Sequence, residues 1–112
     1  MTTTTPPLQQ RLEAILPELI ELRRHLHAHP ELSGEEHQTA ALIAGELRQC
    51  GWRVREGVGR TGVLAELGPQ SGPQLGLRVD MDALPVEERT GLAHASLRQG
   101  VMHACGHDLH SC

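Results

Sequence analysis

The chain has 112 residues, a hydrophobic content of 38% and a formal net charge of −4 with histidine neutral. Its ten basic residues are all arginines spread along the chain, so no basic cluster indicates a nucleic-acid partner. No apolar run is long enough to cross a membrane. The three cysteines, in a chain without a signal peptide, argue against a secreted disulfide framework. These features predict a soluble cytoplasmic protein with neither a nucleic-acid nor a membrane partner.

The composition predicts a thin hydrophobic core. There is one tryptophan and neither phenylalanine nor tyrosine, so the core must rely on aliphatic side chains that bury less area each. The candidate metal-binding and catalytic residues gather near the C-terminal end, where most chains carry polar tails. We therefore expect residues 8–112 to form part of a larger domain. Residues 1–7 are rich in Thr and Pro and are predicted to be a disordered lead-in.

The first predicted element is a helix. Apolar residues recur at helical spacing from Leu8 to Leu26. The pair His29-Pro30 is expected to end the helix, because a residue that precedes proline disfavours the α conformation. Pro17 interrupts the pattern, and it either kinks one helix or begins a second.

A second helix and three strands are predicted to follow. Ser33 and Glu36 match a capping box, which predicts a helix from residue 34 or 35 to residue 50. Beyond Gly51 the apolar period changes to two. This pattern predicts strands over residues 52–55, 62–67 and 75–79. Two helices followed by strands indicate an α/β or α+β layered domain.

Two aspartates follow the third predicted strand. Asp80 and Asp82 are two positions apart, so in an extended chain their side chains project to the same side. Ligand sites in α/β sheets lie at the carboxyl ends of strands. Two carboxylates on one face repel each other unless a cation or a proton lies between them. The alternative is a solvated turn after the strand.

The densest cluster of candidate metal ligands lies at residues 103–110. Cys105 and His107 are separated by Gly106, which permits a sharp bend that directs both side chains to one point. Thiolate and imidazole together suit zinc and similar transition metals. Asp108 is expected to accept a hydrogen bond from a ligand imidazole. Further nitrogen donors in this segment are His103 and His110. A closed structural zinc site normally needs four protein ligands, so an open site completed by distant residues is favoured.

The five other histidines are given weaker roles. His25, His27 and His29 alternate at the end of the first predicted helix, and a helix end is favoured over a metal-binding tract. His37 and His94 stand alone in the sequence and are predicted to lie at the surface.

Three segments resemble, in the same order, three motifs of one enzyme family. They are RRHLHAHPELS at residues 23–33, LRVDMDALP at residues 77–85 and GVMHACGHD at residues 100–108. The family is the amidohydrolase branch of the aminoacylase-type metallopeptidases. It includes hippurate hydrolases, N-acyl-amino-acid amidohydrolases and plant auxin-conjugate hydrolases. The resemblance extends from about residue 19 to residue 110.

The resemblance implies a fold and a reaction. The fold is an α/β, zinc-peptidase-like catalytic domain, of which this chain is the N-terminal part, with two helices followed by strands of a mixed sheet. A smaller dimerisation domain is inserted in the complete proteins, so a homodimer is possible there. The substrates are N-acyl amino acids, whose amide bond is hydrolysed. Two divalent ions of zinc, manganese, cobalt or nickel polarise the carbonyl and activate water, and a glutamate acts as general base.

The resemblance also implies roles for individual residues. Cys105 and His107 match metal ligands, and Cys105 takes a bridging position that related branches fill with a carboxylate. Asp82, the residue assigned a catalytic role, falls where those branches carry an aspartate that orients a ligand. Asp80 falls where they carry a ligand histidine, which this branch replaces with His107. The remaining supporting residues are Asp108 and His110.

Several functional residues of the family have no counterpart in this chain. The catalytic glutamate, a glutamate ligand and two histidine ligands lie downstream of the cysteine motif. Glu87 and Glu88 match a different part of the family pattern and are not expected to replace them. We therefore expect a truncated fragment that is inactive alone. The alternative is a non-catalytic metal-binding or interaction module derived from the family.

Overall fold

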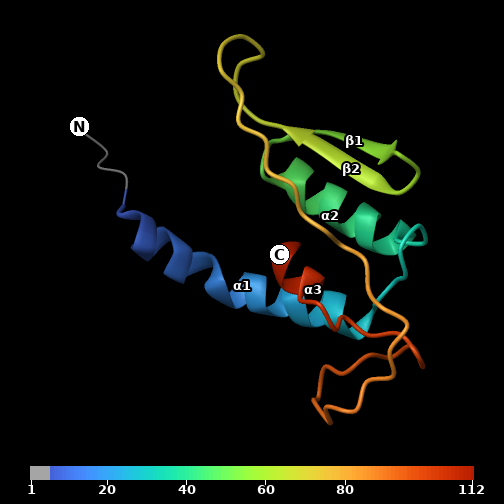
Figure 1. The fold of residues 1–112 in the computed structure, drawn as a ribbon. Coiled ribbons are helices and arrows are strands. Elements are labelled where there is room, and N and C mark those ends of the chain that lie inside the picture. Colours follow the sequence, from blue (N-terminus) through green and yellow to red (C-terminus); the bar gives the residue numbers. More distant parts are fainter. Residues whose placement is uncertain (1–5) are drawn as a thin grey trace.

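The computed structural model describes residues 6–112. Most of the predicted lead-in over residues 1–7 lies outside this range. The elements in chain order are α1 (Leu8–Ala28), α2 (His37–Gln49), β1 (Arg53–Val58), β2 (Gly62–Glu66) and α3 (His107–His110) (Figure 1). Within residues 6–112, no helix is both long enough and apolar enough to span a bilayer.

The first helix is continuous. α1 contains Pro17 in its interior, so the alternative of two separate helices does not apply. Its N-terminal half is exposed, as Leu8 (69%) and Leu12 (50%) illustrate, whereas Leu26 and His27 near its end are buried. The helix stops where expected, with the backbone N–H of His29 bonded to carbonyls of the last turn. Only the C-terminal turns of α1 therefore pack against the rest of the described chain.

The predicted start of the second helix was wrong. α2 begins at His37, and the preceding Glu36 makes no capping hydrogen bond with its side chain. The cap comes instead from Glu31, whose carboxylate accepts a hydrogen bond from the backbone N–H of Thr39 at 2.6 Å. A carboxylate at this end of a helix satisfies free N–H groups and favours the helix dipole. The cap is thus supplied from the loop after α1 rather than by Ser33.

Glu36 ties the loop before α2 to the turn between β1 and β2. Its carboxylate accepts hydrogen bonds from the backbone N–H of Gly34 at 2.8 Å and from the hydroxyl of Thr61 at 2.6 Å. Burial raises the pKa of this carboxyl group, but the hydrogen bonds and the nearby charge of Arg60 outweigh that effect and lower the pKa overall. Glu36 therefore stays ionised and fixes the hairpin turn.

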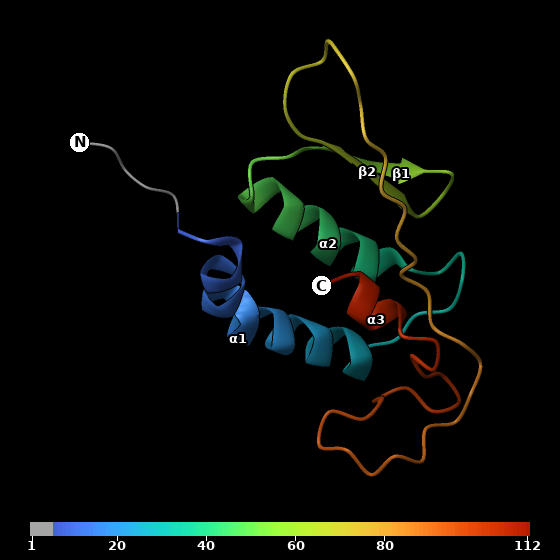
Figure 2. The same ribbon diagram turned by 60° about the vertical axis from the view of Figure 1, so that its left-hand side comes forward.

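The first two predicted strands form an antiparallel hairpin. The register runs from Arg53 opposite Glu66 to Val58 opposite Gly62, with an irregularity between Glu56 and Val58. The hairpin contacts α2 on the side that faces away from α1, so the layers follow the order hairpin, α2, α1 (Figure 2). The alternation of apolar and polar residues predicted this pair correctly.

The third predicted strand was wrong. Residues 75–79 form no ladder with another segment, and Leu75 (99%) and Leu77 (89%) are exposed. Backbone groups of a strand need a neighbouring strand as partner. Pairing resumes just after this segment, where Ala83 forms a parallel bridge with Leu32 and Leu84 forms an antiparallel bridge with Met102. The α/β class is confirmed, with helices and a small antiparallel sheet.

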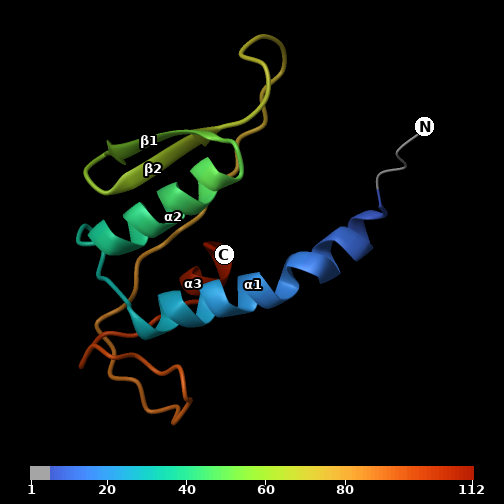
Figure 3. The ribbon, with the colours of Figure 1, turned by 180° about the vertical axis from the view of Figure 1, so that it is seen from behind.

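The core is as small as the composition predicts. The buried hydrophobic side chains in the described part of the chain are Leu26, Ala40, Ala44, Ala83 and Val101. As many polar or charged residues are buried, namely His27, Glu36, Thr39, His103 and Asp108. Two of these five are His27 of α1 and Asp108 of α3, and α3 lies beside α1, between α1 and α2 (Figure 3). Polar contacts therefore carry much of the packing at this point.

Candidate metal centre and adjoining ion network

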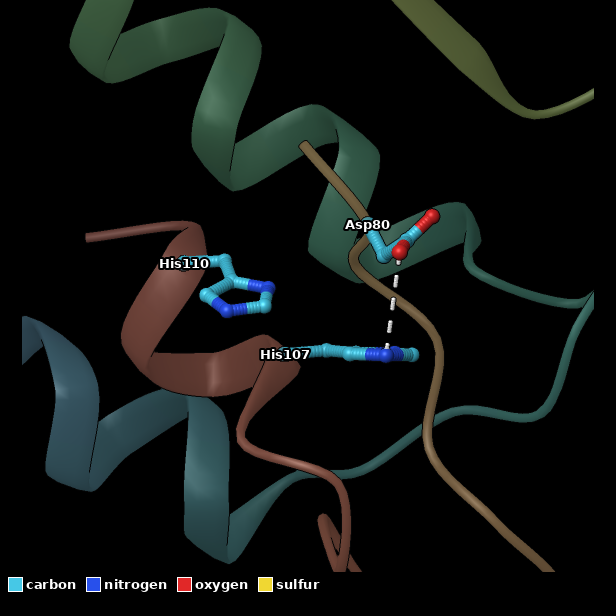
Figure 4. A group of neighbouring side chains, drawn as sticks. All are labelled: Asp80, His107 and His110. Carbon is cyan, nitrogen blue, oxygen red and sulfur yellow. Dashed lines mark ion pairs between the residues drawn. The ribbon is translucent and has the colours of Figure 1, made fainter. Parts of the chain in front are cut away.

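The short helix α3 directs two histidines at the extended segment that carries Asp80. Gly106 precedes the helix with a φ of 78°, the left-handed conformation that favours glycine and turns the chain sharply. The side chains of His107 and His110 project from α3 toward Asp80 (Figure 4). One ligand atom from each of the three residues lies within 4.8 Å of the others. Three potential ligands from two segments thus converge.

The orientation of His107 is set by Asp82. The Nδ1 atom of His107 lies 2.8 Å from the backbone oxygen of Asp82 and 2.9 Å from its Oδ1. Both atoms accept hydrogen bonds, so in the neutral ring Nδ1 carries the proton. The lone pair then lies on Nε2, which faces the Oδ2 of Asp80 at 3.8 Å. Asp82 therefore prepares His107 to bind a cation through Nε2.

The donor set fits a divalent transition metal. Two imidazoles and a carboxylate suit zinc, manganese, cobalt and nickel. Two ligands of one tetrahedral zinc ion lie roughly 3.4 Å apart, given bonds of about 2.0–2.2 Å. The 3.8 Å between His107 and Asp80 needs only a small contraction to reach that spacing. The other oxygen of Asp80 pairs with exposed Arg78 at 2.7 Å.

The remaining predicted site residues lie elsewhere. Cys105 is exposed on the loop before α3 and, among residues 6–112, is not in the group formed by Asp80, His107 and His110. Asp108, the residue after His107, is 1% exposed. Its contacts are with α1 rather than with the candidate ligands.

Asp108 belongs to a buried chain of charged groups that joins α3 to α1. Its Oδ2 lies 2.9 Å from Nε of Arg23 and 2.8 Å from Nδ1 of His27. The other ring nitrogen of His27 lies 3.0 Å from Oε1 of Glu88. The side chains of His27, Asp108 and Glu88 are at most 4% exposed. We refer to Arg23, His27, Asp108 and Glu88 as the ion network.

Glu88 is ionised at the end of this network. Burial raises its pKa, but hydrogen bonds from the Thr90 hydroxyl, from His27 and from the backbone N–H of Ser96 outweigh burial and lower the pKa from 4.5 to about 2. The bonds from Thr90 and Ser96 are both 2.6 Å long. Both ring nitrogens of His27 lie within hydrogen-bond distance of a carboxylate, that of Asp108 at 2.8 Å and that of Glu88 at 3.0 Å.

Two further histidines adjoin the ion network. His103 is 4% exposed, neither of its ring nitrogens has a hydrogen-bond partner among the described residues, and burial lowers its pKa. Its ring centre lies 6.4 Å from that of His27. His94, predicted at the surface, is half-buried, with Nε2 3.4 Å from Arg23. Its distance from Arg23 in sequence is 71 residues, so no local pattern indicated the contact.

The sequence prediction missed the ion network. It placed His27 at a helix end, which is where His27 lies, but assigned it no partner. The spacing of four between Arg23 and His27 on one helix was an available signal, because such residues share a helix face. A helix face that buries an imidazole beside an arginine requires hydrogen-bond partners. The partners themselves come from positions 61 and 81 residues away.

Comparisons with known proteins identify relatives of this chain. Residues 76–112 match the model of Peptidase family M20/M25/M40. A probable hydrolase of Synechocystis sp. is 56% identical over 106 residues, which cover 93% of this chain and 27% of the relative. The N-acetyl-L-cysteine deacetylase of Bacillus subtilis is 50% identical over 101 residues, which cover 89% and 24%.

A solved structure extends the agreement to the fold. The YXEP protein of Bacillus subtilis, described as a dinuclear metal binding peptidase from the M20 family, matches with a TM-score of 0.81 and 44% identity. The match covers 88% of this chain and 28% of that protein. The chain spans about a quarter of the length of the curated relatives it matches. The resemblance carried by the three motifs is thus confirmed, and the chain is similar to members of Peptidase family M20/M25/M40.

Proposed function

We propose that this chain supplies one part of a two-metal centre in a hydrolase that cleaves the amide bond of N-acyl amino acids. The observation that carries the proposal is the pose of His107, whose Nε2 faces Asp80 while Asp82 holds Nδ1. The family supports metal-dependent hydrolysis, and the Bacillus subtilis deacetylase supports an N-acyl amino acid as substrate. Because the chain spans about a quarter of such relatives, the complete activity belongs to a longer protein.

Each residue has a proposed task. His107, His110 and Asp80 bind metal, and Cys105 on the adjoining loop supplies the bridging thiolate. Asp82 fixes the tautomer of His107, and Asp108 anchors α3. When bound, divalent metals polarise a scissile carbonyl and lower the pKa of water. We also propose a cytoplasmic location and a homodimer for the longer protein.

We further propose that the 112 residues alone are inactive. A general base needs a free carboxylate with a pKa near the working pH. Glu88 is held by three donors at a pKa of about 2. The carboxylate of its neighbour Glu87 accepts a hydrogen bond from the backbone N–H of Gly100. Neither residue is therefore suited to activate water.

The test compares the 112-residue chain with a longer protein that contains it and continues through the downstream family motifs. Both are assayed on N-acetyl amino acids with zinc, manganese, cobalt or nickel, and bound metal is measured by elemental analysis. We expect metal-dependent hydrolysis by the longer protein only. Hydrolysis by the short chain would refute its inactivity. A longer protein that binds one metal per chain yet hydrolyses none of these substrates would support the non-catalytic module instead.

A further inference from the structure

We propose that the ion network is a positioning device, with His27 as its central residue. In this inference the network clamps α3 against α1 and thereby holds His107 and His110 in the pose that binds metal. The metal part of the inference rests on the proposed function. The positioning part concerns the chain's own residues and is testable without metal.

α3 needs such a clamp because it has little stability of its own. It consists of four residues, a single turn, and isolated helices of this length do not persist in water. Asp108 is the one buried residue of α3, whereas Leu109 is 64% exposed. Apolar packing therefore contributes little, and the hold on α3 depends on polar contacts.

Two sets of polar contacts hold α3. In the first, Asp108 contacts Arg23 at 2.9 Å and His27 at 2.8 Å, both from α1. In the second, His107 bonds to Asp82, and the hydroxyl of Ser111 donates to the backbone oxygen of Asp80 at 3.0 Å. Asp108 follows His107 directly in the chain. A shift of Asp108 therefore moves the metal-facing imidazole.

We expect the network to depend most on His27, because this residue lies between its two carboxylates. Its two ring nitrogens are both engaged, by Asp108 at 2.8 Å and by Glu88 at 3.0 Å. Loss of the ring leaves both carboxylates buried without the hydrogen-bond partner that lies between them, which disfavours the packed arrangement. The carboxylate of Asp108 is then expected to turn toward water, and α3 is expected to move with it. His27 itself touches none of the candidate metal ligands, so its effect on them is indirect.

A matched control separates positioning from general stability. Leu26 is 2% exposed on the same helix, and it lines a small cavity with His25, Gln38, Thr39 and Leu42 near α2. Leu26→Ala removes core packing without touching the ion network. His27→Gln keeps a similar side-chain size, but its N–H donors are on a single nitrogen and cannot replace both ring nitrogens of His27. The two variants are compared under conditions where circular dichroism shows equal folded fractions.

The first measurement is made without metal. Nitrogen-15 NMR reports the tautomer of His107, and hydrogen exchange reports the protection of the His110 and Ser111 amides in α3. In the wild-type chain we expect the Nδ1–H tautomer and measurable protection. We expect His27→Gln to lower that protection about tenfold or more and to give a mixture of tautomers. Leu26→Ala should leave both unchanged. The proposal would be overturned if His27→Gln altered neither the tautomer of His107 nor the amide protection of α3, or if Leu26→Ala altered them as much. It would also be overturned if the amides of α3 were unprotected in the wild type.

The second measurement uses Co²⁺ as the probe and follows its visible absorption. We expect His27→Gln to weaken Co²⁺ binding about tenfold, the lower end of the effects seen for groups behind metal ligands. Leu26→Ala should bind as the wild type does. Equal affinities of wild type and His27→Gln would refute the positioning role while leaving the metal site intact. If the wild type binds no Co²⁺, the proposed metal site fails, and the metal-free measurement still decides the role of the network.

Discussion

Asp82 and Asp108 serve His107 differently. Asp82 accepts the Nδ1 proton and so directs the lone pair of the ring. Asp108 contacts Arg23 and His27 of α1 and acts through the backbone of α3. The residue pattern favoured Asp108 as the acceptor for a ligand imidazole, whereas the resemblance implied that Asp82 orients a ligand. In the structure the acceptor for His107 is Asp82, 25 positions away.

The pH dependence of stability reports on Glu88. Its pKa is about 2 in the folded chain, below the ordinary 4.5. The stability it contributes is therefore fully present above pH 4.5 and is lost as the pH falls from 4.5 toward 2. We expect the free energy of unfolding in urea to fall over this window by at most roughly 3 kcal/mol more in the wild type than in Glu88→Gln. Glu46→Gln, at an exposed carboxylate on α2, serves as control and should follow the wild type. Identical slopes for wild type and Glu88→Gln would contradict the assignment.

Cys105 can be tested as the proposed bridging ligand. It is exposed in this structure, as is Cys50 at the end of α2. A thiolate bound to Co²⁺ gives an intense charge-transfer band in the near ultraviolet, which imidazole and carboxylate ligands lack. We expect Cys105→Ser to remove this band and Cys50→Ser to retain it. A band that survives in Cys105→Ser would exclude that cysteine as a ligand.

At the scale of elements, the sequence pattern correctly predicted the helix and the hairpin that depend on contacts between residues close in the sequence. The hairpin of β1 and β2 followed from alternating residues around a short turn, and α1 followed from helical spacing. The segment 75–79 has the same alternation but no neighbour to pair with, so its pattern alone did not make a strand. The start of α2 was also misplaced, because its cap comes from Glu31 rather than from the capping-box residue Ser33.

The two possible caps of α2 are distinguished by mutation. The Glu31 carboxylate accepts hydrogen bonds from the N–H groups of Gln38 and Thr39 at 3.2 and 2.6 Å. We expect Glu31→Ala to lower the free energy of unfolding by about 1 kcal/mol, as is usual for loss of a helix cap. Ser33→Ala, at an exposed residue, should change it by less than about 0.5 kcal/mol. Urea denaturation measures both, and a larger loss for Ser33→Ala would favour the capping box over the observed cap.

At the scale of the whole molecule, the chain combines a small core with a polar centre. Composition predicted the thin core, since aliphatic residues alone fill it and many large hydrophobic residues stay exposed. The three motifs predicted the family and drew attention to Asp80, Asp82 and His107. For the ion network the sequence offered only the helical spacing of Arg23 and His27, because Asp108 and Glu88 are brought to them by tertiary packing. Buried charge pairs of this kind depend on tertiary structure.

The central claim is that His107 presents Nε2 to a divalent metal together with Asp80 and His110. The direct test is a Co²⁺ titration of the chain, followed by visible absorption, for wild type, His107→Ala and His37→Ala. His37 is an exposed histidine at the start of α2 and provides a matched control. We predict saturable binding by the wild type, at least about tenfold weaker binding by His107→Ala, and no change for His37→Ala. Equal Co²⁺ affinity for wild type and His107→Ala would contradict the claim.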